Sequence, residues 1–172
     1  TLDTFFLEVE GEGRTRLFAH RQVLLDTLPV ALAGRVDDDA FNALVLTAGL
    51  TWQQVDVIRG LSRYMRQLHV NVSQPQLQAI VLSRPELVAL LVEVFSARFD
   101  PDLPGDRGVA MRSTCEAAEV AIRRLGTHDE DVVFGGLYNL ILAMERTNAC
   151  RDDRVRHYLS FKFDAARVRD LR

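Results

Sequence analysis

Three arginines on one predicted helix are the strongest candidates for binding an anion. Arg59, Arg63 and Arg66 occur at i, i+4 and i+7, which places them on one side of a helix, opposite its apolar stripe. Guanidinium groups donate paired hydrogen bonds to carboxylates and phosphates, so this side could bind an anionic metabolite or a partner's carboxylates. A solvated face, with ion pairs inside the helix or to another domain, explains the same spacing more simply. Gln67 extends this polar set by one residue.

A second polar set is predicted near the C-terminal end of the sequence. Arg146 and Asn148 lie where a helix is expected to end, and a helix end rich in donors can organise a junction between domains. Lys162, the only lysine, lies in a strand-like segment. No constellation of reactive groups accompanies it, so we favour a solvated or interdomain position over a catalytic one.

The sequence carries no recognisable signature of catalysis or cofactor binding. The closest approach to a dinucleotide-binding loop is Gly11-Glu12-Gly13-Arg14-Thr15-Arg16, which lacks the third glycine and precedes a strand-like stretch instead of a helix. The histidines have neither the spacing of paired metal ligands nor a cysteine at ligand distance. The carboxylate clusters at Asp37–Asp39, Asp129–Asp131 and Asp152-Asp153 mostly fall at helix beginnings, where capping and the helix dipole explain them. We therefore predict no catalytic, cofactor-binding or metal-binding residue in this chain.

The composition is that of an ordinary globular domain. With 172 residues, 48% of them hydrophobic and 26% charged, the chain can bury one sizeable core. Its formal net charge of −3 disfavours nucleic acid as a partner. We see no secretion signal and no apolar run that could span a bilayer, so we expect a cytoplasmic protein. Cys115 is expected to be a reduced, buried thiol, and the two cysteines, Cys115 and Cys150, do not suggest a disulfide framework. A chain that begins at Thr1 without methionine is expected to be a segment of a longer protein.

Strand-like segments are expected at both ends of the chain. Residues 1–20 predict a β-hairpin, with strands over Leu2–Val9 and Arg14–Ala19 on either side of a glycine turn. Residues 158–172 predict a strand over Tyr158–Phe163, with Leu159, Phe161 and Phe163 on its apolar face, followed by a linker. A two-stranded hairpin is marginal by itself, so the first one should pack on the helices or belong to a sheet outside the chain.

Helices are predicted throughout residues 21–157. The first covers Val23–Ala33, contains Pro29 and ends at Gly34. Capping boxes, in which Ser or Thr is followed three residues later by Gln or Glu, predict later helix starts at Thr51, Ser73, Ser83 and Thr127. The predicted fold class is therefore mainly α: a bundle-like helical domain with strand material at its two ends.

Four sequence blocks, in a fixed order, give the chain a family resemblance. They are Asp37–Leu46 with Ala48–Trp52 and Arg59–Gln67; Arg84–Leu87 with Leu90–Pro101; Asn139–Asn148; and Tyr158–Asp164. Their order and spacing resemble the very large bacterial NAD-specific glutamate dehydrogenases, in the helical region just before the catalytic domain. The resemblance runs from about Val23 onward and is weakest over Gly105–Arg124. Met65 and Cys150 depart from the family pattern, where leucine and an aromatic residue are usual.

The resemblance implies a non-catalytic region of a larger enzyme. The parent would convert L-glutamate, NAD and water to 2-oxoglutarate, ammonium and NADH, while this fragment would bind no cofactor. Residues 1–20 would be the tail of a preceding regulatory-type (ACT-like) domain. The expected partners are the rest of the polypeptide, other subunits of a homo-oligomer, and an effector. Interdomain or effector contacts would involve Arg59, Arg63, Arg66, Gln67, Arg146, Asn148 and Lys162.

Two other functions compete with this interpretation. A free-standing helical adaptor could bind a protein partner through the arginine-bearing helix. An independent enzyme is disfavoured, since the sequence shows no nucleophile motif, metal cluster or phosphate loop.

Overall fold

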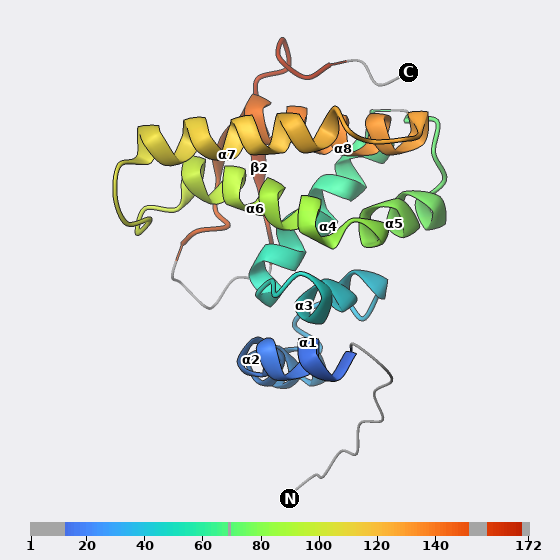
Figure 1. The fold of residues 1–172 in the computed structure, drawn as a ribbon, viewed down its shortest axis with the longest axis vertical. Helices are drawn as coiled ribbons and strands as arrows, with labels where there is room; N and C mark the ends of the chain where they lie inside the picture. The colour runs from blue at the N-terminus through green and yellow to red at the C-terminus, as the bar shows by residue number, and fades with distance from the viewer. Residues whose placement is uncertain (1–12, 69, 152–157, 170–172) are drawn as a thin grey trace, which may run out of the picture.

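The computed structural model describes residues 13–68, 70–151 and 158–169, and most of them are helical (Figure 1). The helices are α1 (Gly13–Ala19), α2 (Arg21–Leu32), the 3-10 helix η1 (Ala40–Ala43), α3 (Leu44–Thr47), α4 (Trp52–Gln67), α5 (Gln74–Ser83), α6 (Pro85–Phe99), α7 (Arg107–Ile122) and α8 (His128–Ala143). Two short strands, β1 (Met144–Thr147) and β2 (Phe161–Phe163), pair antiparallel. The predicted mainly α fold is confirmed.

The helices are stacked along the long axis of the molecule (Figure 1). Helices α1 and α2 lie at one end, α3 lies beside them, and α7 and α8 form the opposite end. Helices α5 and α6 lie between, and α4 crosses behind them. Helix α8 contacts α4, α5, α6 and α7. The core is therefore concentrated between α4 and α8, and the α1–α2 pair is attached at the margin, mainly through α3.

Helix α8 is buried on several sides and contributes many side chains to the core. Val133, Leu137 and Ile141 form a fully buried apolar stripe at helical spacing, and the buried Phe134 and Leu140 widen it. Five buried side chains within nine residues cover more than one face of a helix, as expected of a helix surrounded by others. Helix α8 therefore packs on four neighbouring helices at once.

The predicted caps are confirmed at three of four helix starts. Thr51 forms a reciprocal capping box with Gln54, while the hydroxyls of Ser73 and Thr127 accept hydrogen bonds from the backbone N–H groups three residues later. The prediction at Ser83 is wrong: this residue ends α5 and its hydroxyl donates to the Ile80 carbonyl. A serine hydroxyl between two helices can donate to a carbonyl of the preceding helix or accept from an N–H of the following one. The sequence pattern does not distinguish these two hydrogen bonds.

The first long helix is close to its prediction. Helix α2 covers Arg21–Leu32, continues through Pro29, and is followed by Gly34 with a φ of 65°. That left-handed conformation is open to glycine without a Cβ penalty, and it turns the chain out of the helix.

The strand predicted over Arg14–Ala19 is wrong, because Gly13–Ala19 forms helix α1. Its hydrogen bonding continues toward α2, with His20 N donating to Arg16 O at 2.9 Å. Arginine, leucine and alanine favour helix over strand, and consecutive apolar residues at 17–19 break the alternation that a strand requires. The other predicted strand, Leu2–Val9, lies outside the described residues.

The strand β1 was not predicted. Residues Met144–Thr147 leave α8 and pair with β2, with Met144 opposite Phe163 and Thr147 opposite Phe161. The C-terminal strand is confirmed over Phe161–Phe163. Apolar periodicity continues from α8 into Met144, so the sequence pattern does not show where the helix ends.

Candidate functional site

The β1–β2 hairpin packs against one side of α4. The Phe163 ring stacks on Tyr64, with ring centroids 4.6 Å apart. One turn earlier on α4, a Cβ placed on Gly60 would lie 2.8 Å from the Phe161 ring and 3.3 Å from Leu159. Glycine at position 60 therefore lets the aromatic strand approach the helix backbone, and the predicted apolar face of the strand is confirmed.

Two of the predicted polar residues lie on the outer side of this hairpin. Lys162 pairs with Arg146 in the strand register, and its ammonium forms a 2.6 Å ion pair with Glu145. This hydrogen bond and charge, with smaller contributions from Arg146 and Arg167, lower the pKa of the Glu145 carboxyl. Four charged side chains are thereby gathered at the hairpin, three of them positive.

Asn148 has a local structural role in closing the hairpin. Its amide donates to the Tyr158 carbonyl at 3.2 Å and accepts from the Ser160 backbone N–H at 2.9 Å. Both polar atoms of the side chain are used to hold the strand that follows. Asn148 therefore bridges the two ends of the hairpin connection and does not cap a helix.

Arg59, the first of the three predicted arginines, is buried with 2% of its surface exposed. Its guanidinium donates to both Asp39 oxygens, at 2.8 and 3.0 Å, and to the Asn42 side-chain oxygen at 2.8 Å. It also donates to the Asp56 carboxylate and to the Asp37 carbonyl. All three of its nitrogens are engaged internally. Arg59 is therefore not part of a solvated face and has no nitrogen left without a partner inside the chain.

The carboxylates around Arg59 hold the segment before η1 against α4. Asp39 also caps η1 by accepting from Phe41 N at 3.1 Å, so one side chain connects a helix start to the buried guanidinium. Burial raises the pKa of the Asp56 carboxyl above its ordinary value, opposed by the charge of Arg59 and reinforced by Asp37. Arg59 therefore offsets part of the effect that burial has on this carboxyl.

The other α4 candidates lie on the surface. Arg63 makes a 2.9 Å ion pair with Asp37, in which both side chains are more than half exposed. Arg66 and Gln67 are exposed at the last turn of the helix. The structure therefore separates the predicted arginine set into one buried residue and two surface residues. An interdomain or effector role for the surface residues stays a prediction.

A second ion pair, between exposed Arg84 and buried Glu130, joins α8 to the junction between α5 and α6. Glu130 is 8% exposed and accepts from Arg84 Nε at 2.8 Å and from the Thr127 hydroxyl at 3.0 Å. These hydrogen bonds, that of Arg84 being the larger, lower the pKa of the Glu130 carboxyl. Gln76 adds a 2.7 Å hydrogen bond to Asp129 in the same place. The carboxylates predicted to cap this helix therefore also attach it to α5.

Two hollows lie beside α7, and neither contains the predicted polar residues. The first, about 450 Å³, lies between α6 and α7 and has an apolar lining. The second, about 430 Å³, lies between α7, α8 and the tail near Arg169. Asn139 holds this tail by donating to Arg167 O at 3.1 Å and accepting from Arg169 N at 2.8 Å. Burial and hydrogen bonds raise the pKa of the nearby Tyr138 hydroxyl, which donates to Glu119 at 3.0 Å.

Four apolar side chains form an exposed surface on α1 and α2, called the α1–α2 apolar face below. They are Phe18, Leu25, Leu28 and Leu32, exposed by 63, 58, 36 and 72%. Val23 and Leu24 of α2 are partly buried and pack against the core. Sequence reasoning identified this helix but missed its outer face. The sequence does carry a signal for this face, because apolar residues occur around more than one side of the helix. Such a helix is expected to be covered on more than one side.

Metal and membrane sites are not found in the described part of the chain. Residues 13–68, 70–151 and 158–169 contain no group of three or more histidine, cysteine or acidic side chains arranged to hold a metal. Among the helices that the structure describes, none combines the length and hydropathy that crossing a bilayer requires.

The chain is similar to known proteins over most of its length. Residues 36–101 match the family described as glutamate dehydrogenase, helical motif 3. The NAD-specific glutamate dehydrogenase of Halomonas elongata is 33% identical over 169 residues, which is 95% of this chain and 10% of that protein. Those of Mycobacterium tuberculosis and Pseudomonas aeruginosa are 34 and 28% identical, over 80 and 87% of this chain. The chain thus spans about a tenth of the length of these relatives.

Proposed function

Since this chain is homologous to one segment of the NAD-specific glutamate dehydrogenases and carries their helical motif 3, we propose that it is a structural region of such an enzyme. The complete protein would use NAD to oxidise L-glutamate to 2-oxoglutarate and ammonium, in the cytoplasm and as a homo-oligomer. This region would supply no reacting group. Its task would be to hold other domains or subunits in position.

The α1–α2 apolar face is the observation that carries this proposal. Isolated exposed leucines are ordinary on protein surfaces, but four large apolar side chains on one helix pair mark a contact surface. The helix pair lies at one end of the molecule, away from the α7–α8 layer (Figure 1). A surface in that position is open to another part of a longer polypeptide.

The hairpin and α4 would provide a second, polar contact. Arg63, Arg66, Arg146 and Lys162 are exposed cations on elements that pack on each other through Tyr64 and Phe163. A carboxylate-bearing neighbour or an anionic effector that binds one element would therefore act on the other. The adaptor alternative gains no support, because the three relatives named above are all glutamate dehydrogenases.

Replacing Leu25, Leu28 and Leu32 together by glutamine tests the proposed contact. Glutamine keeps a helix propensity close to that of leucine, so the thermal midpoint of the isolated chain should change little. In the longer enzyme the same changes should lower glutamate-dependent NAD reduction by about tenfold or more, because about 1.4 kcal/mol of lost contact energy already changes an equilibrium tenfold.

The matched control is Tyr158→Gln, which alters a side chain that is 73% exposed outside the α1–α2 apolar face. It should leave both the stability of the chain and the activity of the enzyme unchanged. A triple variant with full activity and normal assembly in the longer enzyme would refute a contact at this face.

A further inference from the structure

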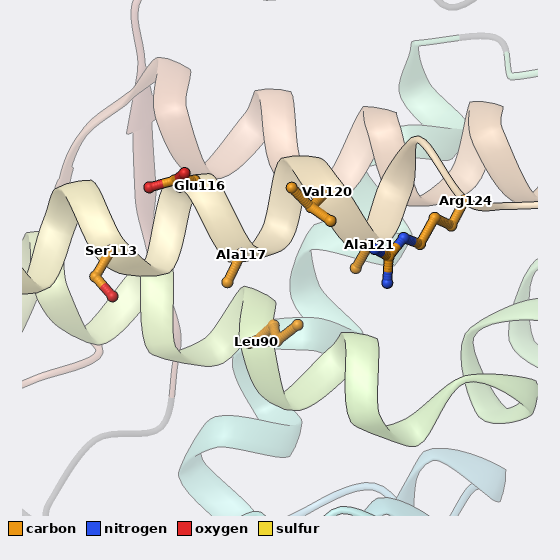
Figure 2. Close-up of a pocket in the computed structure, with 7 residues that line it drawn as sticks. All are labelled: Leu90, Ser113, Glu116, Ala117, Val120, Ala121 and Arg124. Carbon is orange, nitrogen blue, oxygen red and sulfur yellow. The ribbon is translucent and has the colours of Figure 1, made fainter.

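The hollow between α6 and α7 is an apolar groove on the surface (Figure 2). Ala117 and Ala121 lie on the side of α7 that faces α6, across from Leu90, and Val120 lies nearer the crest of α7. The groove has a volume of about 450 Å³. Its apolar lining is open to solvent, so a second surface could enter it without displacing any part of the described chain.

The sequence of α7 explains why the groove is open. Small residues recur at four-residue intervals, at Ser113, Ala117 and Ala121, so one side of the helix has little bulk. Only Ala118 of this helix is fully buried, whereas Val109 is 53% exposed. Small side chains let another helix approach closely, and the exposed valine continues the apolar surface beyond the groove.

The two ends of the groove carry opposite charges. Glu116 lies at one end and Arg124 at the other, eight residues or about 12 Å apart along the helix axis. Both side chains are exposed, and neither makes an ion pair within the part of the chain that the structure describes. Val120 lies midway between them. The charge pattern therefore reverses about Val120, as a self-complementary surface requires.

We propose that this groove docks a second copy of the chain, with the two α7 helices antiparallel about a twofold axis near Val120. In that arrangement the Glu116 end of each copy lies over the Arg124 end of the other, and Val120 meets its own symmetry mate. A twofold contact uses the same patch on both subunits, and the opposite charges at the two ends of this patch meet that requirement. The inference concerns this chain by itself and does not depend on the function proposed above.

The contact should be weak in isolation. One helix face and a shallow groove bury less surface than a standard stable interface does. We therefore expect a dissociation constant on the order of 100 µM. In a longer subunit with further contacts, the same surface would assist assembly at lower concentrations.

Sedimentation equilibrium of the chain, from about 10 µM to about 500 µM, tests the proposal. The unaltered chain should shift from monomer to dimer across this range. Glu116→Arg and Arg124→Glu should each weaken the dimer by about tenfold or more, since each places like charges at both ends of the contact. The double variant should restore dimerisation, because the exchanged charges are complementary again.

Asp38→Arg is the matched control, because it makes the same change of charge at an exposed position far from α7. It should dimerise as the unaltered chain does, and circular dichroism should show every variant folded. A Val120→Cys variant should form a disulfide-linked dimer under mild oxidation. A Leu32→Cys variant should form less of this dimer under the same conditions.

Two results would overturn the proposal. One is an unaltered chain that stays monomeric over the whole range, and the other is a folded double variant that fails to regain the dimer. Hydrogen exchange of the longer protein would then show whether α7 is protected. If α7 is protected in the longer protein while the isolated chain stays monomeric, the groove binds another domain of the same polypeptide. That result would exclude a second copy as its occupant.

Discussion

Replacing Arg59 by methionine is expected to lower the free energy of unfolding by about 3–5 kcal/mol, because it leaves buried acceptors without their cation. The guanidinium serves Asp39, Asp56, Asn42 and the Asp37 carbonyl together. Methionine fills much of the same volume, so the loss should come from uncompensated polar groups more than from a cavity. Urea denaturation at neutral pH, followed by circular dichroism, measures the change.

Arg63→Met is the matched control, one helical turn away. Its ion pair with Asp37 is more than half exposed, so its removal should cost less than about 1 kcal/mol. Equal effects of the two substitutions would contradict the internal role assigned to Arg59.

Phe134→Ala is expected to destabilise the chain by about 3–5 kcal/mol, since it opens a cavity in the middle of the core. Phe134 is fully buried on α8, the helix that contacts four others. The same substitution at Phe18, which is 63% exposed, should cost less than about 1 kcal/mol in the isolated chain.

The contrast between these two phenylalanines can be measured by thermal unfolding of both variants. A large loss at Phe18 in the isolated chain would mean that the α1–α2 apolar face is covered within the chain itself. That outcome would remove the observation on which the proposed contact function rests.

The helical framework could be predicted because its signals are local. Capping residues such as Thr51 and Thr127 act within one turn, and the buried stripe of α8 follows a regular period. These signals place a helix and its core face without knowledge of the rest of the fold. They also placed the C-terminal strand, whose alternation predicted the face that meets α4.

Features that depend on distant contacts could not be predicted in the same way. The strand β1 forms only because Phe161–Phe163 returns beside it, and helical periodicity continues into Met144 without a break. The strand prediction over Arg14–Ala19 was wrong because it relied on the glycine turn and the strand-like segment before it. The residues of this segment themselves favour a helix, which the structure shows. For such short segments, contacts with distant parts of the chain determine the secondary structure.

At the candidate site too, local features could be predicted and contacts with distant residues could not. The spacing of Arg59, Arg63 and Arg66 correctly placed them on one helix, but spacing does not reveal a carboxylate brought from twenty residues earlier. Asp37 and Asp39 were predicted to cap the next helix, and Asp39 does so while also binding Arg59. The exposed leucines of α2 went unnoticed because an apolar helix was assumed to be covered.

In the function proposed above, this region stabilises and positions other parts of an enzyme without binding the reactants itself. Calorimetric titration of NAD into the purified chain, with and without L-glutamate, is the decisive measurement. We expect no saturable binding tighter than about 1 mM and no NADH formed. Saturable binding in the micromolar range, or glutamate-dependent production of NADH by the chain alone, would contradict it.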